Sequence, residues 1–140
     1  MEHQSKQLPD KPSDLLTLAL ADLKKVERSS KYKVAMSKWH MPTADGACAV
    51  CMAGAVIAKT LEVERFKERT PSAFETDTEK KLCAIDYLRR GDLTVALYVL
   101  GFDHPRFLVG AIDVVDYQDD PQQFKKDMQD LIKALKGEGL

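Results

Sequence analysis

The sequence predicts a mainly α-helical (α+β) fold, in which about five helices surround a central buried apolar helix beside a small two-stranded β element. Three observations support this prediction. Apolar residues recur at helical spacing in several segments, and most of these segments begin or end at typical capping residues. Residues 47–58 carry no charge. A chain of 140 residues can also close one hydrophobic core without disulfides or metal ions.

Composition narrows the class of protein. The chain is 44% hydrophobic and 31% charged, which is ordinary for a globular protein. A net charge of −1 gives no general attraction to nucleic acid or anionic membranes, and an odd count of three Cys excludes a fully paired disulfide framework. The longest uncharged run, 46–58, is too short to span a bilayer, which takes about 20 residues. We therefore expect a cytoplasmic protein with no membrane or nucleic-acid partner and no cofactor.

The first predicted helix begins after a polar segment. Residues 1–12 contain two Pro and no periodicity, so we predict a disordered tail followed by one globular helical domain over 13–140. Ser13 is a suitable N-cap. The apolar face then follows at helical spacing, with Leu16, Leu20 and Leu23.

Residues 32–36 alternate between apolar and polar side chains, which predicts a short half-buried strand. Its partner is expected at 107–109 or 111–115. The stretch 24–38 contains six basic residues and one acidic residue, so we expect either a solvated surface or a contact with an anionic partner.

The predicted central helix covers residues 47–61. Asp45 precedes it as an N-cap, which places Cys48 in its first turn. A helix that is apolar on every side is expected to be buried on every side. Small side chains such as Ala53 and Gly54 would allow neighbouring helices to approach closely.

Three further helices follow. Thr76 and Glu79 form a capping box for a helix over about 77–90, and Asp92 caps a short helix over 93–100. Asp120, followed by Pro at the first helical position, starts the last helix. That helix ends at Gly137, and its apolar stripe comprises Phe124, Met128, Leu131 and Leu135.

The CxxC motif of Cys48 and Cys51 allows three chemical hypotheses. Two of them rest on Cys48 at a helix N-terminus: a redox dithiol, and a Cys–His hydrolase with His40 or His104 as the base. The third is a structural zinc site, whose ligands would be His40, Cys48, Cys51 and Cys83. Against all three, buried Cys often acts only as a small apolar residue. On a helix rich in Ala, the sequence favours this packing role.

Two segments are candidates for binding rather than catalysis. Trp39 and His40 precede the predicted central helix, in a loop over 39–45 that is expected to face outward. Within it, Trp39 is expected to cover the core, and His40 to be either a satisfied buried polar group or a ligand or catalytic base. The segment 113–120 is acidic and could meet a basic partner, but its spacing does not match a calcium loop. Its candidate binding residues are Asp113, Asp116, Asp119 and Asp120.

Two stretches, WHMPTADGACAVCMAGAVIAKTL and KKLCAIDYLRRGDLTVAL, resemble small uncharacterised proteins of tailed phages and prophages of proteobacteria. The resemblance extends over most of the chain. It assigns no catalytic residue. It implies expression in an infected bacterial cytoplasm and action by binding a host or phage macromolecule.

The functional expectation is a non-enzymatic interaction protein of phage type, acting as a monomer or a homodimer and binding a host or phage protein. The alternatives are a Cys-dependent enzyme or redox protein centred on Cys48, and a zinc-stabilised module. No Walker loop, dinucleotide-binding Gly motif, GxSxG or HExxH occurs in the chain.

Overall fold

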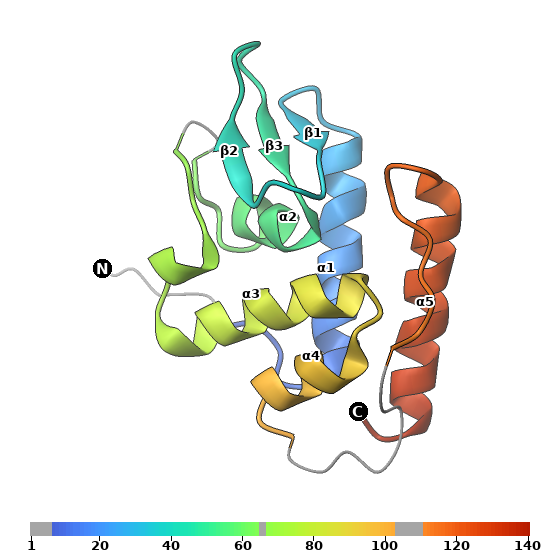
Figure 1. Ribbon diagram of the computed structural model, residues 1–140. Helices are drawn as coiled ribbons and strands as arrows, with labels where there is room; N and C mark the ends of the chain where they lie inside the picture. The colour runs from blue at the N-terminus through green and yellow to red at the C-terminus, as the bar shows by residue number, and fades with distance from the viewer. Residues whose placement is uncertain (1–6, 65–66, 103–110) are drawn as a thin grey trace.

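The computed structural model describes residues 7–64, 67–102 and 111–140. Over these residues the fold is mainly α-helical, with five α-helices and a small three-stranded sheet (Figure 1). In chain order the elements are α1 (Pro12–Glu27), β1 (Tyr32–Val34), β2 (His40–Pro42), β3 (Cys48–Val50), α2 (Met52–Lys59), the 3₁₀ turn η1 (Pro71–Ala73), α3 (Thr76–Arg89), α4 (Leu93–Val99) and α5 (Pro121–Gly137). None of the described helices is both long and apolar enough to cross a membrane.

The sheet differs from the two-stranded prediction. β3 lies in the middle, parallel to β1 and antiparallel to β2. The turn between β2 and β3 contains Asp45 and Gly46, and Gly46 adopts a φ of +88°, which favours glycine. The predicted pairing of β1 with 111–115 is wrong, since only Ala111 in that segment forms a bridge, and it does so with Asp92. The other predicted partner, 107–109, lies outside the described residues.

The predicted helix over 47–61 is wrong in its bounds. Residues 48–50 form β3, and α2 begins only at Met52 with Cys51 as its N-cap. Asp45 instead organises the hairpin turn, where its carboxylate accepts a hydrogen bond from the Ala47 amide at 3.2 Å. Every residue of α2 except Lys59 is buried. The uncharged segment therefore fills the interior as a strand followed by a helix.

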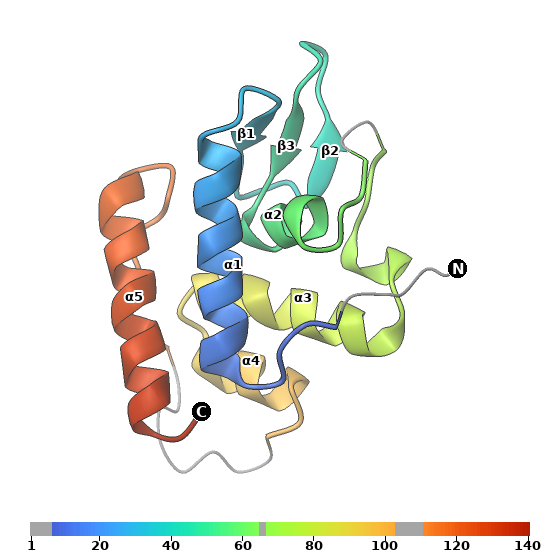
Figure 2. The same cartoon turned by 180° about the vertical axis from the view of Figure 1, so that it is seen from behind.

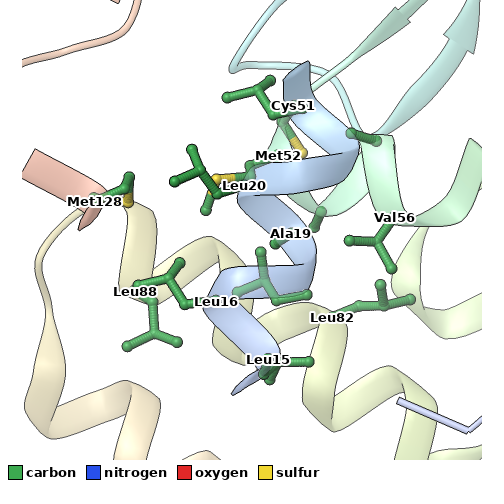
Figure 3. Packing of buried hydrophobic residues seen from close by; sticks show 14 of the residues in the cluster. Leu15, Leu16, Ala19, Leu20, Cys51, Met52, Val56, Leu82, Leu88 and Met128 are labelled. Atoms are coloured by element: carbon green, nitrogen blue, oxygen red, sulfur yellow. The ribbon is translucent and has the colours of Figure 1, made fainter. Parts of the chain in front are cut away.

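The core joins all five described helices, and α4 contributes Leu93 and Ala96 to it. Most of its residues project from α1, α2, α3 and α5 into one cluster (Figure 3). α1 packs against α2 on one side and α5 on the other, and it also contacts α3. Ten of the residues shown in the figure are Leu15, Leu16, Ala19, Leu20, Cys51, Met52, Val56, Leu82, Leu88 and Met128.

α5 runs antiparallel to α1 along its length (Figure 2). Asp120 caps α5 as predicted, accepting a hydrogen bond from the Gln123 amide at 3.1 Å, and the predicted apolar stripe is buried. Ser13 does not cap α1, because the helix begins one residue earlier, at Pro12, with Lys11 in the N-cap position. The Ser13 hydroxyl instead donates to the Leu140 carbonyl at 3.1 Å. This bond ties the C-terminus to the beginning of α1.

Part of the segment before α1 contacts the folded domain. Leu8 is buried in the core. The ammonium of Lys81 donates to the Leu8 carbonyl at 2.9 Å and to the Asp10 carboxylate at 2.7 Å. Residues 7–12 therefore pack against α3, while 1–6 lie outside the described residues.

Candidate functional site

Both thiols of the CxxC motif are enclosed in the core. Cys48 lies on β3 and is 0% exposed, and Cys51 is 1% exposed at the N-cap of α2. The Cys51 sulfur accepts a hydrogen bond from the Gly54 amide at 3.4 Å. Burial nevertheless raises the pKa of Cys51 to about 11, so the thiol is protonated at neutral pH. The prediction that Cys48 lies at a helix N-terminus is wrong, because Cys48 is on β3 and Cys51 takes the N-cap position of α2. Cys48 therefore lacks the support of a helix dipole for a thiolate.

His40 connects β2 to the segment after α2 through hydrogen bonds. Its imidazole is 0% exposed, and its Nδ1 hydrogen bonds with the Lys67 carbonyl at 2.8 Å, which makes Nδ1 the donor. The Arg69 amide donates to the His40 carbonyl at 2.8 Å. Nε2 is buried and has no hydrogen-bond partner among the described residues. His40 is therefore a buried histidine with one ring nitrogen bonded to the backbone, which is one of the two roles that the sequence left open. His104 lies outside the described residues.

The buried imidazole predicts an acid-sensitive fold. Burial lowers the pKa of His40, so the unfolded chain binds more protons than the folded chain below pH about 6.5. The stability that the neutral His40 contributes is fully present above pH about 6.5. As the pH falls below that value, the free energy of unfolding decreases by up to about 1.4 kcal/mol per pH unit. Urea unfolding at a series of pH values between neutrality and mild acid measures this slope.

The control is His40→Asn, whose amide can still donate to the Lys67 carbonyl but does not titrate. The difference in slope between the two proteins isolates His40 from every other ionisable group. Equal slopes would contradict a buried neutral imidazole.

The proposed zinc ligands do not form a metal site. Among residues 7–64, 67–102 and 111–140, no three His, Cys, Asp or Glu side chains are placed to hold a metal ion. Cys83 lies on α3 and is only partly buried, whereas His40 and Cys48 lie on the β2–β3 hairpin.

Trp39 is half-buried, and its carbonyl oxygen would lie 1.5 Å from a Cβ added at Gly54. The backbone before β2 is therefore seated directly on α2.

Residues of the acidic segment 113–120 stabilise a local turn and the start of α5. Asp116 accepts a hydrogen bond from the Gln118 amide at 2.9 Å, and Asp120 caps α5. Asp113 and Asp119 are exposed. The segment is fastened to the chain near the C-terminal end of α1, because the Tyr117 hydroxyl donates to Glu27 at 2.6 Å. Two of the four predicted binding carboxylates thus hold local turns and a helix end.

An open groove of about 590 Å³ lies between α1 and α5. Its floor is apolar and comes from Leu20 and Ala21 of α1 and from Ile132 of α5. Three lysines border it, and no acidic side chain lines it. The complete lining is Thr17, Leu20, Ala21, Lys24, Gln129, Ile132, Lys133 and Lys136.

Helical periodicity separates the charges of α5 between its two flanks. The flank toward α1 repeats at helical spacing and carries Lys125, Gln129, Ile132, Lys133 and Lys136. Of the acidic residues, Asp130 faces solvent one helical turn from Lys126 and Lys133, and Asp127 falls on the opposite flank. Asp127 accepts a hydrogen bond there from the Val115 amide at 3.0 Å.

The basic border continues past the apolar floor toward the C-terminal end of α1. A neighbouring hollow shares Lys24 and Gln129 with the groove and adds Arg28, Lys125 and Lys126. Its one carboxylate is Glu27, which pairs with Lys125 at 2.9 Å. The combined surface, which we call the α1–α5 groove, is therefore positive along its whole length.

Sequence reasoning found only half of this site. The basic stretch 24–38 was recognised, and it contributes Lys24 and Arg28. The sequence did not indicate Lys133 and Lys136 as site residues, because the apolar stripe is the strongest pattern in α5. The sequence feature that could have indicated them is the flank of lysine and glutamine residues beside the apolar stripe of α5, which contains no acidic residue. Pairing this flank with α1 requires the fold.

Comparisons with known proteins add no relative. No family model, no curated protein and no solved structure matches this chain.

Proposed function

We propose that this chain is a non-enzymatic binding protein that holds an acidic segment of another protein in the α1–α5 groove. The observation that carries the proposal is a basic border around an apolar floor between two helices, in which the one lining carboxylate, Glu27, is paired with Lys125. Such a surface complements a segment that presents apolar and acidic side chains together.

The candidate catalytic groups are buried, whereas the groove is open, and this difference also supports the proposal. Cys48, Cys51 and His40 are enclosed in the core, where a substrate cannot reach them. Three lysines of the groove, Lys126, Lys133 and Lys136, are in comparison exposed at the edge of an open hollow.

An acidic protein segment suits the groove better than nucleic acid does. No aromatic side chain lines the hollow, so bases would find no stacking platform. An apolar floor gives a phosphate backbone nothing to bind, whereas it can bury leucine or valine side chains. The resemblance to phage proteins adds a setting to this proposal: the partner would be a host or phage protein in a bacterial cytoplasm.

Reversing two lysines of α5 should weaken binding of an acidic peptide. The probe is a fluorescein-labelled peptide rich in Glu and Leu, and its Kd is measured by fluorescence anisotropy. In Lys133→Glu/Lys136→Glu, two attractive contacts at the border become repulsive, so we expect Kd to rise about tenfold. Added salt should weaken binding to the unmodified protein, because exposed charges are screened.

The charge-matched control is Lys31→Glu/Lys38→Glu, which reverses two exposed lysines outside the groove. This variant should keep the unmodified Kd. A second peptide, with Gln in place of every Glu, should bind weakly to all three proteins. Equal weakening by both double substitutions would mean that only net charge matters, and it would refute the groove as the binding surface.

A further inference from the structure

We infer that the segment bound in the α1–α5 groove is an amphipathic α-helix lying along α1 and α5. This inference rests on the proposed function and adds to it the conformation and side-chain pattern of the partner. The partner helix would place an apolar stripe on the floor and acidic residues on both sides of that stripe.

The walls of the groove favour a helix. α1 and α5 lie side by side and antiparallel (Figure 2), and the hollow between them is lined by residues of both helices. A third helix packs into such a hollow by the same ridge-and-groove geometry that joins helices in bundles. The polar groups of its backbone would be satisfied within the helix, so an apolar floor suits it.

The pattern of the floor matches one stripe of a helix. Ala21 is small and exposed on α1, which leaves room for a partner side chain between the two walls. Leu20 and Ile132 supply the apolar contacts beside it. Lys24 borders the floor on the α1 side, while Lys133 and Lys136 border it on the α5 side. Charges on both borders require acidic residues on both flanks of the partner.

The length of the surface sets the length of the partner. From Thr17 to Arg28, the lining extends over roughly 17 Å of α1 at about 1.5 Å per residue. A partner helix of about three turns would cover this distance. An extended peptide bound by strand addition would need an exposed sheet edge, and the walls of this groove are helices.

The test uses two labelled peptides of identical Leu, Glu and Ala composition. In one peptide, leucines fall at i, i+3, i+4 and i+7 with glutamates on both flanks; in the other, the order is scrambled so that no stripe forms. We expect the amphipathic peptide to bind about tenfold tighter, because scrambling removes one or two leucines from the floor. Circular dichroism should show that its helical content rises on binding.

A substitution in the floor provides the second arm. Ala21→Gln adds a neutral polar side chain at an exposed position, so it fills the floor without altering charge or core. It should weaken the amphipathic peptide about fivefold and leave the scrambled peptide unchanged. Ala73→Gln, at an exposed alanine outside the groove, should leave both unchanged.

The outcomes separate this inference from the proposed function. Equal affinities for the two peptides, both lost in Lys133→Glu/Lys136→Glu, would overturn the helical partner but keep an acidic one. No dependence on these lysines would overturn both. Lysine-dependent binding of a single-stranded oligonucleotide or an anionic vesicle, without peptide binding, would replace the protein partner. Self-association lost in the same variant would identify a second copy of this chain as the occupant, and would overturn a separate partner.

Discussion

Replacing Gly54 with alanine should lower the free energy of unfolding by about 3 kcal/mol, the upper end of the usual cost of overpacking. An added Cβ would lie 1.5 Å from the Trp39 carbonyl oxygen and 3.1 Å from the Val50 side chain. The first of these neighbours is backbone, so relief requires β2 or α2 to move. Alanine favours a helix over glycine by only about 1 kcal/mol, which is too little to compensate. Thermal unfolding should show a decrease in Tm of roughly 10 °C.

Gly137→Ala is the matched control. Gly137 ends α5, and an added Cβ there meets nothing within 4 Å. The same substitution should therefore leave stability unchanged or raise it by about 0.5 kcal/mol. If Gly54→Ala were as stable as this control, the Trp39 backbone would not be seated on α2 as described. That result would also remove the anchor that fixes the start of β2.

Much of the helical framework could be predicted from local signals. Asp92 and Asp120 cap helices in the structure as the sequence indicated, and the apolar stripe of α5 is buried. Such features depend on residues within one or two turns of each other, so the sequence displays them directly. The sheet was harder, because β1 pairs in parallel with a strand that follows it only after the intervening β2.

The misassigned start of the central helix has a specific cause. Residues 47–50 are as apolar as the helix that follows, and a buried strand cannot be told from a buried helix by periodicity when both are uncharged. The overlooked signal was Asp45-Gly46 between two short apolar segments, which is typical of a hairpin. Read as an N-cap, Asp45 placed Cys48 on a helix and suggested thiolate chemistry. Read as a turn, it places Cys48 on the middle strand of the sheet.

The groove illustrates the other limit of sequence reasoning. Each helix shows its own basic flank, but nothing local indicates that Lys24 and Lys133 border the same hollow. Their proximity depends on α5 returning antiparallel to α1, which the Ser13–Leu140 and Lys125–Glu27 bonds hold at its two ends. A site shared by distant helices therefore becomes visible only when the tertiary structure is known.

The thiols of Cys48 and Cys51 should react with a maleimide at least about a thousandfold more slowly in the folded protein than in guanidinium chloride. Both are essentially unexposed, so a reagent reaches them only when the core opens. With an ordinary stability of about 5 kcal/mol or more, the open state is populated to less than about one part in a thousand. The raised pKa of Cys51 slows its reaction further in the folded state.

Cys83 supplies the internal reference, because it lies on α3 and is only partly buried. Peptide mapping by mass spectrometry should find Cys83 labelled first, although burial raises its pKa as well. In the Cys83→Ser protein, the rate of labelling should follow the opening of the fold. Adding Gly54→Ala should accelerate labelling by roughly a hundredfold, because a loss of about 3 kcal/mol in stability raises the population of the open state by about that factor. Rapid labelling of Cys48 in the folded Cys83→Ser protein would restore the thiol enzyme as a hypothesis. Slow labelling that tracks global unfolding leaves the CxxC motif with a packing role, and it leaves the accessible chemistry of the chain to the α1–α5 groove.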